Sequence, residues 1–375
     1  MSLRSHLHSS QIIVLKEPVS MFRLLTTSLA VYLMVSLTLF ANSFLLVSLP
    51  EEHQIAVYQI EQESGALRHV RDHKLPADPG PMSVSHDGKT LYLSLRNAGE
   101  LASFSIDPES AELTHLTTVG ADQDPAYHWQ DYTASYLFSA YYHTGRVSIH
   151  SLGNDGRILV EPTRWIKTEL KAHCIMATSD NRHVFVPHTG PNKIFQFTFD
   201  ADKGTLELKE DGVLVSEQQT GPRHIDIHPR KPWAYVDYEQ GNKVAFYRIN
   251  AGKLVRKQVL TSVPKDWPEG EGATSRLTLS PDARFVYAAN RGHNSIAGFK
   301  INRFTGKLTS IGHVATEANP RSFVMTDCGK WLYAGGQDTN RIALFSRNVN
   351  NGTLRRIDTI PTGRKPWWLQ IVNQR

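Results

Sequence analysis

The chain has 375 residues, a formal net charge of +5 and a hydrophobic fraction of 40%, which is enough apolar material for a globular core. Its Lys and Arg residues are dispersed rather than gathered into runs, which argues against a nucleic-acid-binding stripe and permits a small anionic ligand. The two cysteines, Cys174 and Cys328, lack metal-ligand spacing, so we expect two buried free thiols and no metal site.

The N-terminal extension, residues 1–42, carries a targeting pattern. No charged residue occurs between Leu24 and Pro50, while Arg4, Lys16 and Arg23 precede that run. This arrangement predicts a signal peptide or a signal anchor, with residues 24–41 as a membrane tether at the lower length limit for spanning. We therefore expect an exported or membrane-anchored protein. The alternative is a cytoplasmic protein whose true start is an internal methionine.

From residue 43 onward the sequence repeats a module of four short strands. A typical module contains an opening strand, a polar turn, a β-branched and aromatic strand, an alternating strand, and a Gly-x-Leu signal such as Gly306-Lys-Leu308. The opening strands begin near seven positions: Pro81, Pro125, Ala172, Pro222, Ser275, Pro320 and Pro366. Four strands repeated every forty to fifty residues or so are typical of a β-propeller.

The two ends of the repeat region complete each other. The first module lacks its own opening strand and starts at Phe44, whereas the last opening strand, Pro366–Val372, has no module after it. The sequence thus predicts an all-β, seven-bladed β-propeller domain over residues 43–375, closed by pairing of the C-terminal strand with the N-terminal blade. A closed ring of this kind is expected to be a monomer.

Chemistry-bearing residues gather at one predicted mouth of the central channel. Because strands one and two of a blade are antiparallel, the start of strand one and the end of strand two lie at the same mouth. The residues at these positions are Met82, Arg96, Tyr127, His128, Tyr141, Tyr142, His173, His188, Arg223, His224, Glu239, Arg276, Asn290, Arg291, Arg321, Gln337 and Trp367.

Four of these residues, Arg223, Arg276, Arg291 and Arg321, would crowd like charges at a narrow opening, which favours a site for an anion. Each arginine could instead pair with a blade carboxylate or lie in water. Between Glu239 and His173, either is a candidate proton acceptor, since nearby arginines keep a carboxylate ionised and an imidazole neutral. No Gly-x-Ser-x-Gly elbow, His-Glu-x-x-His motif or phosphate loop occurs, so neither a cofactor nor a metal is expected.

Five segments resemble the lactonase seven-bladed β-propeller family, which includes propeller-type 6-phosphogluconolactonases and is related to the 3-carboxymuconate lactonising cyclase. They are Ala172-His-Cys174, Gly221–Pro229, Tyr235–Glu239, Ala288–Ile296 and Asn319–Phe323. The resemblance covers the ring from about residue 43 to the C-terminus.

The resemblance places the family's site histidine on His173 and its site glutamate on Glu239. Its site arginines fall on Arg223, Arg291 and Arg321. Arg276 stands where family members usually carry an acidic residue, which either tightens binding of an anion or marks a change of substrate.

This resemblance implies a metal-independent lactonase, a carboxylic ester hydrolase that opens a sugar-acid lactone. The expected substrate is 6-phosphogluconolactone, an intermediate of the pentose phosphate pathway. His173 or Glu239 would activate water, Arg223 and Arg291 would stabilise the oxyanion, and Arg321 with Arg276 would hold the phosphate or carboxylate. Further candidates for substrate contact are His224, Tyr142 and Gln337. The alternatives are a muconate-type lactonising cyclase and an exported propeller that binds a ligand without turnover.

Overall fold

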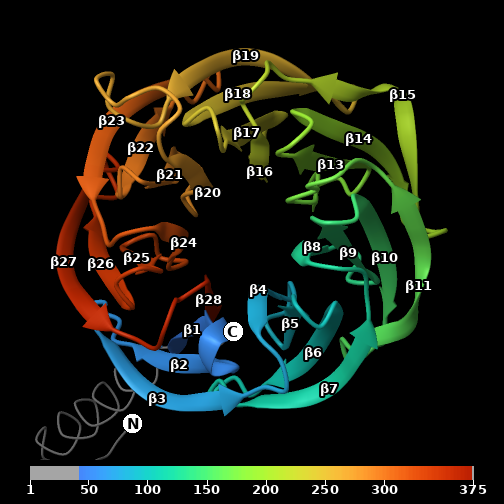
Figure 1. The fold of residues 1–375 in the computed structure, drawn as a ribbon, viewed down its shortest axis with the longest axis horizontal. Coiled ribbons are helices and arrows are strands. Elements are labelled where there is room, and N and C mark those ends of the chain that lie inside the picture. The colour runs from blue at the N-terminus through green and yellow to red at the C-terminus, as the bar shows by residue number, and fades with distance from the viewer. Residues whose placement is uncertain (1–41, 374–375) are drawn as a thin grey trace, which may run out of the picture. The chain divides into compact units, whose positions relative to one another are not determined.

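The computed structural model describes residues 42–373, and their strands form seven four-stranded antiparallel sheets. Figure 1 shows these sheets as blades around a ring, each with one strand near the centre and one at the periphery. The all-β, seven-bladed β-propeller is therefore confirmed. The predicted tether at residues 24–41 lies outside the described residues. Among those described, no helix is long and apolar enough to cross a membrane.

The four strands of each blade follow one another outward from the channel. Blade 1 contains β28 (Trp368–Asn373), β1 (Ser43–Leu49), β2 (Gln54–Ile60) and β3 (Leu67–Lys74). Blade 2 contains β4 (Pro79–Val84), β5 (Thr90–Leu95), β6 (Glu100–Ile106) and β7 (Leu113–Gly120). Blade 3 contains β8 (Pro125–Gln130), β9 (Tyr136–Tyr141), β10 (Arg146–Leu152) and β11 (Ile158–Lys167). Blade 4 contains β12 (Met176–Ala177), β13 (His183–His188), β14 (Lys193–Asp200) and β15 (Thr205–Val215).

Blade 5 contains β16 (Pro222–Ile227), β17 (Trp233–Tyr238), β18 (Lys243–Asn250) and β19 (Lys253–Thr261). Blade 6 contains β20 (Ala273–Leu279), β21 (Phe285–Arg291), β22 (Ser295–Ile301) and β23 (Leu308–Ala315). Blade 7 contains β24 (Pro320–Met325), β25 (Trp331–Gly336), β26 (Arg341–Arg347) and β27 (Leu354–Pro361). A single 3₁₀ turn, η1 (Pro50–Glu52), is the only helical segment within residues 42–373.

Burial differs between strands because each blade packs both faces against its neighbours. All six residues of β17 are buried, as are all seven of β1. The outermost strands are mostly exposed or half-buried instead, and β27 exposes most of its side chains. Apolar, β-branched and aromatic sequences thus form the second strands, which lie in the core between blades.

The ring closes as the sequence predicted. β28 pairs antiparallel with β1, from Ser43 opposite Asn373 to Ser48 opposite Trp368. The last strand of the chain therefore supplies the innermost strand of the first blade, which leaves β1 paired on both sides.

Both cysteines are free. Cys174 is buried as expected, but the expectation for Cys328 is wrong, because its side chain is exposed on a turn.

The Gly-x-Leu signal is explained by contacts between neighbouring blades. Gly306 has φ +79° and a Cβ there would overlap the ring of Phe246 in the preceding blade. The Tyr235 hydroxyl of that blade donates a hydrogen bond to the Gly306 carbonyl at 3.0 Å. Gly352 repeats the arrangement one blade later, with φ +80° and its carbonyl 2.6 Å from the Tyr287 hydroxyl. Only glycine combines this backbone conformation with so close an approach.

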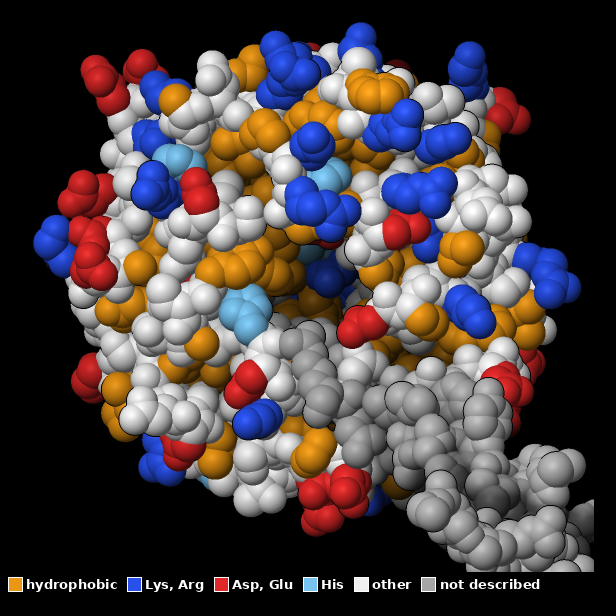
Figure 2. All heavy atoms as spheres, turned by 180° about the vertical axis from the view of Figure 1, so that it is seen from behind, with side chains coloured by type: hydrophobic (Ala, Val, Ile, Leu, Met, Phe, Trp, Pro, Cys, Tyr) orange, Lys and Arg blue, Asp and Glu red, His pale blue; other side chains and the backbone are white. Residues whose placement is uncertain are grey.

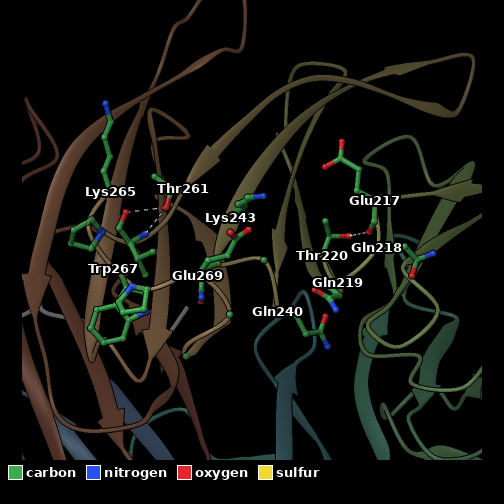
Figure 3. A pocket seen from close by; sticks show the side chains of 17 residues that line it. Glu217, Gln218, Gln219, Thr220, Gln240, Lys243, Thr261, Lys265, Trp267 and Glu269 are labelled. Atoms are coloured by element: carbon green, nitrogen blue, oxygen red, sulfur yellow. Dashed lines mark hydrogen bonds between the residues drawn. The ribbon is translucent and has the colours of Figure 1, made fainter.

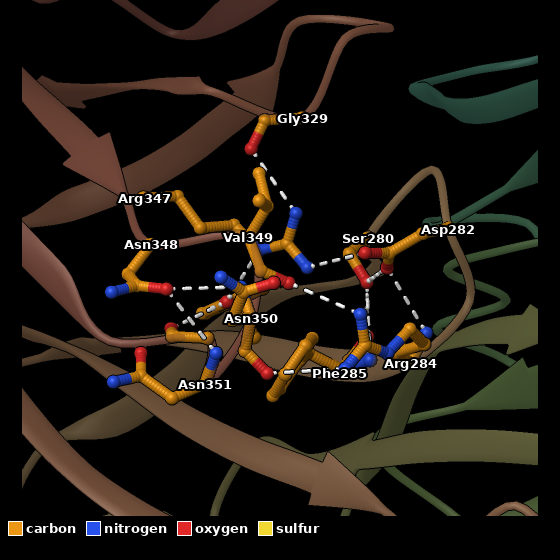
Figure 4. A network of polar contacts seen from close by, with 12 residues as sticks. Ser280, Asp282, Arg284, Phe285, Gly329, Arg347, Asn348, Val349, Asn350 and Asn351 are labelled. Carbon is orange, nitrogen blue, oxygen red and sulfur yellow. Dashed lines mark hydrogen bonds and ion pairs between the residues drawn. The ribbon is translucent and has the colours of Figure 1, made fainter.

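A buried arginine joins blades 6 and 7 (Figure 4). The Arg347 guanidinium donates to Asp282 at 2.8 Å, to the Tyr287 hydroxyl at 3.0 Å and to the Gly329 carbonyl at 3.1 Å. It also lies 4.8 Å from the centre of the Phe285 ring. This charge is buried and each of its three nitrogens donates a hydrogen bond, so it acts as a cross-link between two blades.

Candidate active site

A cavity of about 690 Å³ lies at one mouth of the channel. It is lined by six of the nine site residues predicted from the sequence, namely Tyr142, His173, Arg223, Glu239, Arg291 and Arg321. Figure 2 shows one face of the ring with a hollow at its centre and basic side chains within the hollow. The volume is in the range of small-molecule sites, so a sugar-sized ligand fits.

Irregular inner strands aim three of these side chains. In β16, Pro222 lies opposite Tyr238 and Ile225 opposite Val236, so two residues, Arg223 and His224, face the single Asp237. In β24, Arg321 is the extra residue between two regular pairs. His173 lies between the isolated bridge at Ala172 and the short strand β12. Bulges of this kind re-aim side chains.

The other predicted residues come from the ends of second strands. Glu239 follows β17, and its backbone is held on both sides, because its N–H donates to the Gly221 carbonyl and its carbonyl accepts from the Thr274 N–H. Arg291 is the last residue of β21, and Tyr142 follows β9. The starts of the innermost strands and the ends of the second strands therefore meet at this mouth, as expected from their antiparallel pairing.

Glu239 is held by two arginines. Its Oε1 accepts from Nη2 of Arg291 at 2.5 Å, and its Oε2 lies 3.6 Å from Nε of Arg223. Burial alone would raise the pKa of Glu239, but Arg223 and Arg291 outweigh it and hold the pKa below its usual value. The carboxylate is thus ionised, with a hydrogen bond at Oε1 and the charge of Arg223 near Oε2.

His173 is a neutral imidazole in a cationic environment. Burial, followed by the charges of Arg223, Arg321 and Arg96, lowers its pKa well below the ordinary value. Its Nδ1 is buried and has no hydrogen-bond partner among the described residues, so Nε2 is the nitrogen that reaches the cavity. The ring lies 5.7 Å from that of Tyr142 and 5.0 Å from that of His224.

Three predicted substrate-contacting residues, Arg276, His224 and Gln337, do not line this cavity. Arg276 is the fourth residue of β20 and lies opposite Ala289, two positions deeper than Arg291. Its guanidinium stacks over the Trp368 ring at 4.3 Å. Arg276 therefore lies deeper than the cavity lining, because β20 begins earlier relative to its bulge than β16 or β24 does, and its contribution of charge to the mouth stays a prediction.

His224 lies behind the cavity wall. Its Nδ1 accepts a hydrogen bond from Nη1 of Arg223 at 2.9 Å, and its backbone N–H donates to Asp237 at 2.5 Å. Gln337 follows β25 and is buried. Of the other mouth positions, Arg96 and Trp367 line the cavity, whereas Met82, Tyr127, His128, Tyr141, His188 and Asn290 do not.

Sequence reasoning missed residues that loops contribute, chiefly Asp124, Asp78, His143, Glu51 and Lys365. Asp124 and Lys365 lie in the connections that lead from one blade into the next strand one, and these connections end at the same mouth. Both residues directly precede an opening strand in the sequence, and this position could have indicated that they lie at the mouth. Within residues 42–373 no group of three or more His, Cys, Asp or Glu side chains is arranged to hold a metal ion.

A larger cavity of about 920 Å³ lies among the loops of blades 4 to 6 (Figure 3). Loops leading into β16 and β20 and the turn after β17 form it, with amide side chains such as Gln219 and Gln240 and the indole of Trp267. None of the predicted site residues lines it. It has the carboxylates of Glu217 and Glu269 but no imidazole or guanidinium group to act with them, so the channel mouth is the candidate active site.

Known proteins resemble this chain over the whole ring. A family model described as "Lactonase, 7-bladed beta-propeller" matches residues 43–371. A 6-phosphogluconolactonase of Enterobacter sp. (strain 638) is 30% identical over 326 residues, 86% of this chain and 97% of that protein. A 6-phosphogluconolactonase of Cronobacter sakazakii is 29% identical over 324 residues, 86% of this chain and 96% of that protein.

Solved structures show the same ring. The crystal structure of a putative 6-phosphogluconolactonase from Bacteroides fragilis has a TM-score of 0.79 and 25% identity, covering 88% of this chain and 98% of that one. The periplasmic gluconolactonase of Pseudomonas aeruginosa shares the fold, with a TM-score of 0.82 and 22% identity over 88% of this chain and 99% of that one. From the family match and its relatives, the chain is a lactonase, a carboxylic ester hydrolase, and belongs to the lactonase, 7-bladed beta-propeller family.

Proposed function

We propose that this protein hydrolyses a sugar-acid lactone that carries one anionic group, with 6-phosphogluconolactone as substrate, 6-phosphogluconate as product and the pentose phosphate pathway as setting. The curated relatives named above support this substrate. The observation that carries the proposal is the incomplete neutralisation of the arginines in the cavity.

The ion pairs of the cavity do not give every arginine a carboxylate of its own. Lys365 pairs with Glu51 at 2.7 Å, and Arg96 pairs with Asp124. Arg223 and Arg291 share the single carboxylate of Glu239. Asp78 lines the cavity without an ion pair in the described part of the chain.

Arg321, 3.8 Å from the centre of the Trp367 ring, has no carboxylate partner within residues 42–373. A substrate anion at Arg321 and an oxyanion near Arg223 and Arg291 would each meet guanidinium groups that lack a carboxylate of their own.

The geometry favours His173 as the base. Its neutral Nε2 can accept a proton from water as the hydroxide oxygen attacks the lactone carbonyl. The carbonyl oxygen becomes an oxyanion, which Arg223 and Arg291 stabilise. When the bond to the ring oxygen breaks, the imidazolium returns the proton to that leaving oxygen. Glu239 is less suited to accept a proton, because Oε1 accepts a hydrogen bond from Arg291, the charge of Arg223 lies near Oε2, and its pKa is lowered. Its role is to orient the two guanidinium groups.

Steady-state hydrolysis of 6-phosphogluconolactone tests these assignments. We expect His173→Ala to lower kcat by about a hundredfold to ten-thousandfold, as loss of a general base does. Glu239→Gln should lower kcat/KM by at least about tenfold, since hydrogen bonds between charged groups are lost. The control is His115→Ala on the exposed side of β7, which should retain full activity. Full activity of both site variants would remove both roles, and turnover of a carboxymuconate instead would indicate the cyclase.

The location of the protein is a second part of the proposal. The apolar run at residues 24–41 supports export or membrane anchoring, and a phosphorylated lactone is more readily reconciled with a cytoplasmic protein. Mass spectrometry of the mature N-terminus decides between them. Cleavage near Ala41 would contradict the cytoplasmic alternative, and an uncleaved start at Met34, which removes most of the apolar run, would contradict export.

A further inference from the structure

The cavity has two walls, which differ in how the charges of their arginines are paired. Arg223, Arg291 and Arg321 come from blades 5, 6 and 7, whereas Arg96, Asp124 and Tyr142 come from blades 2 and 3. Arg96 follows β5 directly, and Asp124 directly precedes β8. The two walls therefore face the cavity from different sectors of the ring, with His173 of blade 4 between them.

On the blade 2 and 3 wall, Arg96 and Asp124 form a tight ion pair. Oδ1 of Asp124 accepts from both Nε and Nη2 of Arg96. The two side chains are only 16% and 10% exposed, and the Arg96 guanidinium lies 4.9 Å from the centre of the Trp367 ring. Side chains packed in this way lose little further entropy when a ligand binds, so the pair is preorganised.

The pair keeps hydrogen-bonding capacity that nothing in the described chain uses. Oδ2 of Asp124 lies 3.6 Å from Nδ1 of His143, too far for a hydrogen bond. Nη1 of Arg96 makes no hydrogen bond within residues 42–373. One carboxylate oxygen of Asp124 and one nitrogen of Arg96 are thus left to hydrogen-bond a ligand in the cavity that both residues line.

Asp124 offsets the charge of Arg96, whereas Arg321 has no carboxylate partner among the described residues. The pair therefore attracts an anion less than Arg321 does, and its remaining acceptor and donor suit neutral hydroxyl groups, each of which donates one hydrogen bond and accepts others. A ligand without hydroxyls would strip water from these groups and leave them unpaired, which is strongly unfavourable.

We propose that Asp124 and Arg96 form a hydroxyl-binding subsite that selects lactones with free hydroxyl groups on the ring or side chain. This inference rests on the proposed lactonase function and deepens it, because it names the residues that reject unsubstituted lactones. Arg96 and Arg321 both lie against Trp367, so the hydroxyls bound by the subsite are neighbours of the anionic group at Arg321.

The test compares two uncharged lactones that share a six-membered ring, D-glucono-1,5-lactone and δ-valerolactone. Because neither is charged, the cation that Asp124→Ala leaves at Arg96 attracts neither. We expect this variant to lower kcat/KM for gluconolactone by about tenfold to a hundredfold, the effect of losing hydrogen bonds to a charged group, with δ-valerolactone changed less than about twofold. Asp124→Asn keeps one acceptor oxygen and should show an intermediate loss.

The matched control is Asp122→Ala in the same loop. Asp122 pairs with Arg146 at 3.3 Å and does not line the cavity, so both lactones should react as with wild type. Equal losses for the two lactones in Asp124→Ala, or no loss for either, would overturn the subsite while leaving the lactonase function intact.

Absence of wild-type turnover would instead defeat the proposed function. Binding then tests the subsite by itself, by NMR titration with 1,5-anhydro-D-glucitol, a neutral ring analogue that cannot be hydrolysed. Asp124→Ala should weaken this binding by about tenfold or more. Unchanged binding would overturn the subsite.

Discussion

Asp237 illustrates how a single buried residue supports the site. Its side chain is fully buried, its Oδ1 accepts the His224 N–H at 2.5 Å, and its Oδ2 has no hydrogen-bond partner among the described residues. Burial raises the pKa of Asp237 to about 6, although Arg223, the His224 N–H and Arg276 act in the opposite direction. The cost of removing the carboxylate from water therefore outweighs its attraction to the neighbouring charges, and the ionised form of Asp237 is unfavourable in the folded protein.

Substitution of Asp237 by asparagine should stabilise the fold above pH 6. The folded pKa of about 6 exceeds the ordinary value of 3.8, so the folded state binds more protons between these values and wild-type stability from this group falls as pH rises. The amide of the Asp237→Asn variant would keep the acceptor oxygen without the charge. We expect a gain on the order of 1–3 kcal/mol at pH 7.5 that vanishes near pH 4, measured by urea unfolding of both proteins. A gain of equal size at both pH values would contradict this account.

At the scale of the strand, irregularity positions the chemistry. The inner strands β16, β20 and β24 each carry a register shift near their start, and the shift in β16 exposes Arg223 to the cavity while turning His224 behind it. In a regular strand Arg223 and His224 would point to opposite faces of the sheet, and only one of them would lie opposite Asp237. Bulges at the channel mouth are therefore part of how the site is built.

β28 is the element on which closure depends. Trp368, Leu369, Ile371 and Val372 are all buried. At about 1.5–3 kcal/mol each, their burial is comparable to the whole stability of a typical domain. We expect a chain truncated after Thr362 to lose its cooperative thermal transition and its activity. A synthetic peptide of residues 363–375 should restore part of both, as measured by calorimetry and by lactone hydrolysis. An unaltered transition in the truncated chain would show that β28 does not close the ring.

Across the whole molecule, contacts between blades recur at the same places. Tyr235, Tyr287 and Tyr333 each donate to a glycine carbonyl of the following blade, at 3.0, 2.6 and 2.7 Å. The last of these joins blade 7 to blade 1 through Gly65. Together with Arg347, these buried hydrogen bonds connect neighbouring blades, so the ring has specific links as well as hydrophobic packing.

Arg347 is expected to be the strongest of these links. Replacement by methionine would retain much of the buried stem but leave Asp282 and the Gly329 carbonyl without their donor. We expect a loss of about 3 kcal/mol, at the lower end for a broken buried pair because Asp282 is 33% exposed. Thermal unfolding would show this as a lower midpoint. Arg341→Met, at the exposed start of the same strand, is the control and should leave the midpoint unchanged.

Much of the architecture could be read from local patterns. Period-two alternation, the repeated turns and the unmatched Pro366–Val372 strand predicted the blade number and the closure, because each is a short-range property of the chain. The same reasoning brought His173, Arg223, Glu239, Arg291 and Arg321 to one mouth, since antiparallel pairing decides which strand ends coincide.

The sequence by itself determined the seven-bladed ring and the mouth at which the guanidinium groups gather, because alternation and turns act between near neighbours. Only the tertiary structure decided how deep each side chain lies and which charges it meets. Arg276 lies below the mouth because of the bulge position in β20, and Asp124 enters the cavity from a loop to pair with Arg96 across two blades. Depth and pairing depend on register and on contacts between distant segments, which no local pattern encodes.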